Sequence, residues 1–247
     1  MKINRLHSWR IDYKKAVQIQ ESLKDSVVLE KPKGRIQTIA GADVSDDKHS
    51  NRFFAGIVVF TYNHLQLIEE VTAVGKAAFP YIPGLLSFRE APVLIRAFGK
   101  LKSEPDIILF DGQGIAHPRR FGLASHVGLI LDKPAIGCAK KRLVGEHADV
   151  ENVEGAYTNL FYRNDVVGAA LRTKINTKPV YVSPGHKVDL MSAIRIVIKA
   201  CRGYRIPVPI RQAHILVNKL RKKYESQEKK SKIWGDSTNE TTCSGSL

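Results

Sequence analysis

The chain has 247 residues, of which 43% are hydrophobic and 26% are charged, and its formal net charge is +15. The first two values are typical of one globular domain with or without tails. The basic excess indicates a polyanionic partner, most often nucleic acid, although a merely basic soluble protein is the alternative. No apolar run reaches the roughly 20 residues of a membrane span, and no apolar signal core follows Met1. Three widely spaced cysteines form no CxxC pair, so we expect a cytoplasmic protein without membrane contact, disulfide framework or zinc knuckle.

The N-terminal third predicts one helix followed by three antiparallel strands. Apolar residues at helical spacing indicate the helix within 11–29. Strand patterns follow at 36–44, 53–60 and 65–74, separated by short polar turns, which is typical of an antiparallel meander. The first of these strands ends in small residues and one carboxylate, Asp43.

Residues 80–84 read Pro-Tyr-Ile-Pro-Gly, which predicts a rigid loop with an aromatic residue at its tip. A helix is expected from Ser87 to about Leu101. Ser87 is a candidate N-cap, and Glu90 follows three residues later, as in a capping box. A structural role for Glu90 therefore competes with a catalytic one.

A buried strand is predicted at 107–110, and Asp111 and Gly112 follow it directly. A carboxylate at the carboxyl end of a buried strand, before a glycine-rich turn, is placed where open α/β sheets bind ligands. The alternative is that Asp111 only forms a turn or caps a helix.

Basic residues surround this turn. His117 and Arg119 follow it, and a second apolar strand, 135–139, ends in Lys140 and Lys141. Imidazole, guanidinium and ammonium groups suit phosphate oxygens, so acid at one strand end and cations at another predict a site for metal and phosphate.

The C-terminal third predicts further strands at 166–172 and 180–182, a turn at 183–186, a helix at 189–201 that begins at Asp189, and a last helix at 209–224. The segment 225–247 is polar and basic, and we expect it to be mostly disordered. The expected organisation is one catalytic domain, 1–224, and a tail.

Three antiparallel strands followed by alternating helices and strands predict an α/β fold of the ribonuclease H type, a mixed sheet flanked by helices. In this arrangement the first and fourth strands can lie side by side, which would bring Asp43 and Asp111 together with Glu90 between them in the chain. Carboxylates held together without a cation repel one another, and a divalent ion removes the conflict. Oxygen ligands of this kind suit Mg²⁺ or Mn²⁺.

The stretch DGQGIAHPRRFGLASHVGLILDKPAIGCAKKRL, from Asp111 to Leu143, resembles the signature of endonuclease V, a family of deoxyinosine-directed repair nucleases, in its prokaryotic form. The resemblance extends over roughly 39–209 and implies the same ribonuclease H-like fold. In this family the acids of GADV, SFRE and DGxG are the metal-site residues. The resemblance therefore implies metal ligands at Asp43, Glu90 and Asp111, with Mg²⁺ as the cofactor and Mn²⁺ as a substitute.

The resemblance also implies roles for three basic residues. Lys140, in IGCAKKRL, would steady charge at the reacting phosphate, and His186, in SPGHKVDLMSA, would lie beside the metal site. His117, in GIAHPRRFG, would lie near the cleaved strand. As alternatives, His117 is a buried structural histidine that donates to a loop carbonyl, and His186 simply follows the Ser-Pro-Gly turn.

The family's PYIP wedge is present at Pro80, Tyr81, Ile82 and Pro83. The resemblance implies that the tyrosine inserts at the lesion and helps to hold the damaged base out of the stack. Gly112 and Arg119 complete the expected nucleic-acid contacts. As bare sequence, the same four residues are more often a packed loop.

The expected function is that of a metal-dependent DNA repair endonuclease, with Asp43, Glu90, Asp111, Lys140 and His186 as its catalytic residues. The resemblance implies cleavage at the second phosphodiester 3′ to deoxyinosine, leaving a 3′-hydroxyl and a 5′-phosphate. We expect the protein to be a monomer. The partner is DNA with deoxyinosine or other deaminated bases, with RNA as an alternative substrate. The rivals are a ribonuclease H-fold resolvase, an inosine-directed ribonuclease, and a basic nucleic-acid-binding protein whose acids are structural.

Overall fold

The computed structural model describes residues 1–47 and 50–236, and for 228–236 it describes the backbone alone. In these residues it has α1 (Tyr13–Leu23), η1 (Lys24–Ser26), β1 (Thr38–Asp47), β2 (Arg52–Thr61), β3 (Leu67–Lys76), α2 (Leu86–Phe98), β4 (Ile107–Phe110), α3 (Leu123–Leu131), β5 (Ala135–Ala139), β6 (Tyr157–Tyr162), β7 (Asp165–Leu171), β8 (Val180–His186), α4 (Leu190–Cys201) and α5 (Val208–Asp236). Among these helices, none combines the length and the apolar character that crossing a bilayer requires.

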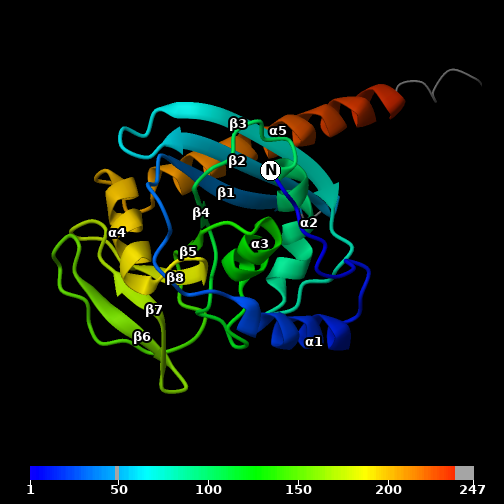
Figure 1. Cartoon of the computed structure of the whole chain (residues 1–247). Coiled ribbons are helices and arrows are strands. Elements are labelled where there is room, and N and C mark those ends of the chain that lie inside the picture. Colours follow the sequence, from blue (N-terminus) through cyan, green and yellow to red (C-terminus); the bar gives the residue numbers. More distant parts are fainter. Residues whose placement is uncertain (48–49, 237–247) are drawn as a thin grey trace, which may run out of the picture.

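All eight of these strands join in one sheet, in the order β3-β2-β1-β4-β5-β8-β7-β6 (Figure 1). β1, β2 and β3 are antiparallel, and β4 and β5 run parallel to β1. β8, β7 and β6 then extend the sheet in antiparallel fashion. The mixed ribonuclease H-like sheet that the sequence predicts is confirmed.

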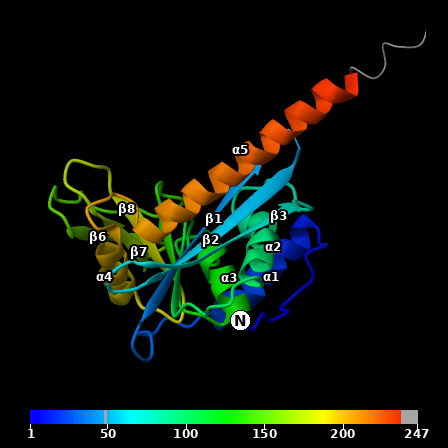
Figure 2. The ribbon, with the colours of Figure 1, turned by 90° about the horizontal axis from the view of Figure 1, so that it is seen from above.

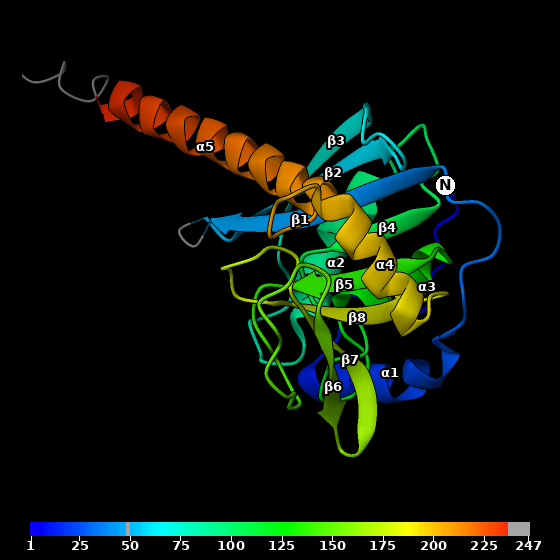
Figure 3. The same ribbon diagram turned by 90° about the vertical axis from the view of Figure 1, so that its left-hand side faces the viewer.

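Helices cover both faces of the sheet, and this explains the uninterrupted apolar sequence of its central strands. In β4, Ile108 and Phe110 pack in the core beneath α2 and α3, whereas Ile107 and Leu109 pack in the core beneath α4 and α5. Figure 3 looks onto the α4 and α5 side. Successive side chains of a strand point to opposite faces, so a strand covered on both faces must be apolar at every position.

Several predicted boundaries differ from the structure. β1 continues to Asp47, so Asp43 lies within the strand and not at its end. The segment 183–186, expected as a turn, belongs to β8. Helix α5 continues past Tyr224 and projects beyond the sheet (Figure 2), so 225–236 is helical where the sequence predicts disorder. The rest of the expected tail, 237–247, lies outside the described residues.

Candidate active site

The register between two parallel strands brings the first two predicted acids together. Ala42 of β1 is paired with Phe110 of β4, and the Asp111 amide donates to the Ala42 carbonyl at 3.2 Å. The next residue of β1 is Asp43, which is only 8% exposed. The prediction that Asp43 and Asp111 lie side by side is therefore confirmed, and neither is a helix cap.

A third group joins them from helix α5. The Nδ1 of His214 lies 2.7 Å from Oδ2 of Asp43, and possible ligand atoms of Asp43, Asp111 and His214 all lie within 4.8 Å of one another. The Asn218 side-chain amide donates to Nε2 of His214 at 3.0 Å. The imidazole is therefore held from both sides, with Nδ1 as the donor to the carboxylate.

A glycine in β1 determines how closely α5 can approach the acids. A Cβ placed on Gly41 would lie 2.1 Å from the carbonyl carbon and oxygen of Pro209, in the first turn of α5. Real atoms do not approach so closely, so any larger residue would force the helix away from the strand. His214 lies on the second turn of the same helix. The absence of a side chain at Gly41, two residues before Asp43, therefore lets α5 bring the imidazole to the Asp43 carboxylate.

Glu90 does not take part in a capping box. The N-cap of α2 is Leu85, without a side-chain cap, and Ser87 lies inside the helix. The Ser87 hydroxyl instead hydrogen bonds to Nδ1 of the buried His126 at 3.0 Å. The predicted cap at Ser87 is wrong because the helix begins one residue earlier, and the structural alternative for Glu90 falls with it.

The Glu90 carboxyl is partly buried and feels the other acids. Burial is the main cause that raises its pKa from 4.5 to about 8, and the negative charges of Asp43, Asp111 and Asp46 add to the effect. Glu90 is not among the three residues whose ligand atoms converge. It is nevertheless electrostatically part of the site, because the same cation that neutralises Asp43 and Asp111 would relieve Glu90.

Lys140 supplies the positive charge that the sequence places at the end of β5. Its ammonium forms an ion pair with Oδ2 of Asp111. The two groups meet because β4 and β5 are parallel neighbours, so the residues that follow them emerge at the same edge. The Lys140 side chain is 41% exposed, so its ammonium can also reach a ligand at this edge.

The donor set of this site suits a divalent cation. Burial, and secondly the charge of Asp111, raise the pKa of Asp43, while the hydrogen bond from His214 works in the opposite direction. A cation bound to both carboxylates would offset the cost of burying them together. Two carboxylates with one imidazole fit Mg²⁺ with several retained waters, and also Mn²⁺, which accepts nitrogen more readily.

His186 does not join the acids, and its prediction as a metal-site residue is corrected. Because β8 runs antiparallel to β5, its last residue, His186, is paired with the first residue of β5, Ala135. Asp111 and Lys140 lie at the opposite edge. His186 is buried there, with Nδ1 accepting from the Val28 amide at 3.3 Å. The late histidine of the site is His214.

A cavity of about 420 Å³ opens beside the acids. Tyr81, Ile82 and Pro83 of the predicted wedge line one part of it. Gly112, Gln113 and His117, from the turn that follows β4, line it as well, and so do Asp111 and its ion-pair partner Lys140. Pro80 and Arg119 are not among them. Tyr81 is 67% exposed, so its ring is not core packing, whereas Ile82 packs against Phe79 and Phe88.

The loop that carries Tyr81 is fixed at Gly84. This residue has φ +77°, in the left-handed region that favours glycine. Its carbonyl oxygen lies within hydrogen-bonding distance of three donors: His117 Nε2 at 2.9 Å, Arg119 at 2.8 Å and Gln20 Nε2 at 3.1 Å. Burial, and then the charge of Arg119, lower the pKa of His117 to about 4, so the ring is neutral near pH 7.

His117 and Arg119 both make structural contacts in this loop. His117 makes the contact of a structural histidine that donates to a loop carbonyl, while its ring also lines the cavity. The Arg119 guanidinium is engaged with Gln20 and Gly84. It therefore holds the loop against α1 in this structure.

Comparison with known proteins agrees with the fold. Residues 21–215 match the family model of endonuclease V. The endonuclease V of Methanothrix thermoacetophila is 50% identical over 216 residues, which are 87% of this chain and 95% of that protein. The crystal structure of the Bacillus subtilis endonuclease V superposes with a TM-score of 0.87 at 33% identity, covering 92% of this chain and 100% of that one.

A further crystal structure shows a relative with nucleic acid. The endonuclease V of Ciona intestinalis, in complex with a 24mer DNA containing an inosine followed by a ribo-adenosine, superposes with a TM-score of 0.74 at 28% identity, covering 85% of this chain and 98% of that one. The family match spans α2, the turn that follows β4 and the start of α5, which contribute residues to the site. This chain belongs to the endonuclease V family of nucleases.

Proposed function

We propose that this protein is a divalent-metal-dependent endonuclease that cuts DNA at the second phosphodiester 3′ to deoxyinosine. The products are a 3′-hydroxyl and a 5′-phosphate, and the altered base stays on its sugar. Support from the relatives is that the Ciona protein was crystallised with DNA containing inosine.

The observation that carries the proposal is that one cavity joins the wedge loop to the acid cluster. The acid cluster consists of Asp43, Asp111 and Glu90. Asp111 and its ion-pair partner Lys140 also line the cavity that Tyr81 borders. A base held in this cavity therefore lies next to the groups that would act on the strand. A resolvase needs the acids but has no use for a base-sized cavity beside them.

The cavity has the chemistry of a site for an extruded base. Its volume of about 420 Å³ is within the range of small-molecule sites, and its walls are largely apolar. Gln113 donates from Nε2 to the Lys141 carbonyl at 3.0 Å, which leaves its buried Oε1 without a hydrogen-bond partner. An unpaired acceptor suits the N1–H donor that hypoxanthine has and adenine lacks.

An exposed Tyr81 complements this cavity. Taking a base out of the duplex costs a few kcal/mol, and less when the base is mispaired. An aromatic ring that fills the space left in the stack recovers part of that cost. Tyr81 can make this contact because Gly84 fixes the loop while the ring remains in solvent.

The clustered acids would perform hydrolysis at the second phosphodiester 3′ to the base held in the cavity. Asp43, Asp111 and His214 would hold the cation, which supplies Lewis-acid stabilisation of the phosphate charge when bound. Water forms a new bond to phosphorus while the bond to the 3′ oxygen breaks. That oxygen takes up a proton and becomes the 3′-hydroxyl. Lys140 places an ammonium where negative charge grows on the phosphate.

Nicking of labelled duplexes tests the proposal. One duplex carries a single deoxyinosine, a matched duplex carries adenine, and a four-way junction serves as the resolvase substrate. We expect Mg²⁺- or Mn²⁺-dependent nicking of the inosine strand alone, at the second bond 3′ to the lesion. Asp43→Asn should abolish it, and Asp149→Asn, an exposed acid away from the cluster, should not.

Other outcomes have definite meanings. Preferential cutting of the junction would favour the resolvase, and metal-independent binding without cutting would favour a nucleic-acid-binding protein. An all-RNA strand with one inosine, and a DNA strand with one ribonucleotide after the inosine, measure the ribonuclease alternative. If either of these strands is cut faster than the all-DNA strand, the preferred substrate contains ribonucleotides and is not DNA alone.

A further inference from the structure

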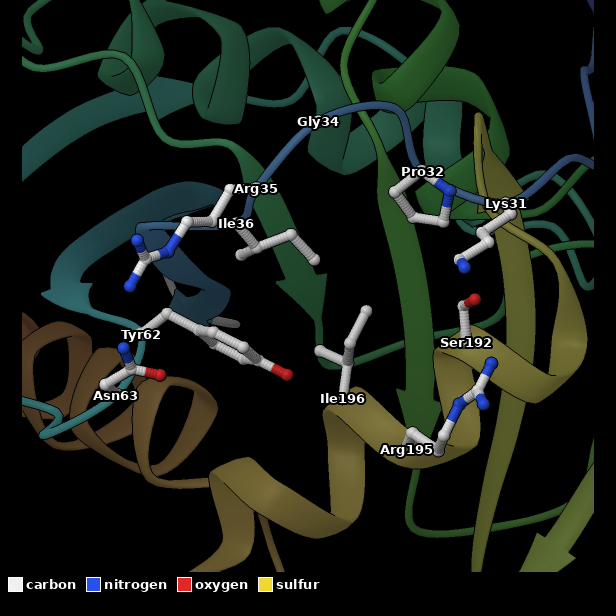
Figure 4. A pocket seen from close by; sticks show the side chains of 10 residues that line it. All are labelled: Lys31, Pro32, Gly34, Arg35, Ile36, Tyr62, Asn63, Ser192, Arg195 and Ile196. Carbon is white, nitrogen blue, oxygen red and sulfur yellow. The ribbon is translucent and has the colours of Figure 1, made fainter.

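A second cavity, of about 440 Å³, lies away from the acid cluster (Figure 4). Its walls come from the segment before β1, the turn after β2, and helix α4. Ile36 precedes β1 and Tyr62 follows its antiparallel partner β2, so both lie at the edge where β1 begins. Asp111 follows β4, which is parallel to β1, so it emerges at the opposite edge. The two cavities share no lining residue.

Three cationic side chains surround this second cavity: Lys31, Arg35 and Arg195. Among the side chains of residues 1–47 and 50–227, none offers these three cations an ion pair or a side-chain hydrogen bond. Guanidinium and ammonium groups arranged in this way are typical of oxyanion sites.

Ser192 provides an enclosed donor between these cations. Its residue is 6% exposed, and its amide donates to Oδ1 of Asp189 at 2.6 Å. The Ser192 hydroxyl forms no hydrogen bond with a described protein group, so it is free to donate to a molecule in the cavity that it lines. Figure 4 shows this hydroxyl and the Lys31 and Arg195 side chains turned toward the same part of the cavity.

The rest of the cavity is suited to a flat organic group. Ile36 and Ile196 form an apolar surface, and the Tyr62 side chain reaches between them in Figure 4. The Lys199 ammonium lies 4.1 Å from the centre of the Tyr62 ring, and the same ammonium donates to Oδ1 of Asn63 at 2.9 Å. These contacts hold the ring in place without an external ligand.

We propose that this cavity binds a nucleotide phosphate, with Lys31, Ser192 and Arg195 on the phosphate and Tyr62 beside the sugar or base. The Asp189 carboxylate already accepts from the Ser192 amide at the start of α4, and we assign the phosphate contacts to the side chains and not to the helix end. The phosphate can belong to a free nucleotide or to a nucleic-acid strand. The inference does not depend on the proposed nuclease activity.

Calorimetric titration of the full chain with adenosine 5′-monophosphate tests this inference. We expect one saturable site that weakens at least tenfold in Arg195→Gln and several-fold in Ser192→Ala. Arg10→Gln removes an exposed guanidinium elsewhere on the surface and should change nothing. Adenosine without phosphate should not bind. Equal binding of adenosine, or loss of binding only in Lys140→Gln, would overturn the proposal.

The affinity for an undamaged duplex, measured at several salt concentrations, distinguishes a phosphate of a nucleic-acid strand from that of a free nucleotide. If a strand phosphate occupies the site, Arg195→Gln should reduce the slope of log affinity against log salt by about 0.9, while the mononucleotide does not bind. If the mononucleotide binds and the slope is unchanged, the ligand is a free nucleotide. If the mononucleotide does not bind and Arg195→Gln leaves the salt slope unchanged, the proposal is wrong. Inosine nicking should remain the same in Arg195→Gln, so this result is separate from the test of the nuclease.

Discussion

Replacing Glu90 with glutamine should remove much of the pH dependence of stability in the metal-free protein. Burial first, and then the neighbouring acids, raise the pKa of Glu90 from 4.5 to about 8 in the folded chain. Between these values the unfolded chain loses the proton and the folded chain keeps it. The free energy of unfolding therefore falls as pH rises through this window, by up to about 1.4 kcal/mol per pH unit. Below and above the window Glu90 contributes no slope.

Urea unfolding in the presence of a chelator, at half-unit steps from about pH 5 to pH 8.5, measures this effect. The quantity of interest is the difference between the wild type and Glu90→Gln. Burial lowers the pKa of His117 to about 4, so this group makes stability rise with pH through its ordinary range, but the contribution is common to both proteins and cancels. Glu151→Gln, an exposed acid, is the matched control and should follow the wild type.

A divalent cation should reverse the trend. A cation favours the ionised carboxylates, so Mg²⁺ or Mn²⁺ should stabilise the wild type more at pH 8 than at pH 6. Parallel curves for the wild type and Glu90→Gln over the whole window would refute the reasoning. Glu90 would then be ionised in the folded protein, and the acids would not be electrostatically coupled.

Three further substitutions test separate parts of the site. Gly41→Ala should push α5 from β1, cost at least about 1–3 kcal/mol of stability in urea unfolding, and reduce nicking more than tenfold through the displaced His214. Tyr81→Ala should lose roughly 1–3 kcal/mol of affinity for an inosine duplex in a binding assay and leave the melting temperature unchanged, because the ring is 67% exposed; a lowered melting temperature would make it core packing. Gln113→Leu should reduce the preference for inosine over adenine in competitive nicking, and an unchanged preference would remove Gln113 from base recognition.

The sequence predicts the middle of the sheet well because local pattern and global position agree there. The run 107–110 is apolar at every position, as a strand covered on both faces must be, and Asp111 and Lys140 follow parallel strands. Their meeting at one edge is then a consequence of strand direction. The end of β1 is harder to predict from the sequence. Ser45 and Asp46 are polar residues of the kind that usually mark a turn, yet they pair with β2.

The two histidines show what local pattern leaves open. The motif Ser-Pro-Gly-His suggests a turn, but β8 continues through it, and its antiparallel direction carries His186 to the wrong edge. His214 has no spacing signal, since it is a single half-exposed histidine on a helix. The available hint was Gly41, a small residue in the strand that carries Asp43, which permits a close crossing. Only the structure shows that α5 makes that crossing.

The site draws its groups from both layers of helices, and this links metal binding to the docking of α5. Asp43 and Asp111 come from the sheet, Glu90 from α2 on one face, and His214 from α5 on the other. Without a cation, α5 is held near the acids by the contact at Gly41 and by the hydrogen bond of His214 to Asp43. A cation shared by the carboxylates and the imidazole would add a link between the strand and the helix. Binding free energy gained there would also be docking free energy for the first turns of α5, so a bound metal would stabilise the fold at the candidate active site.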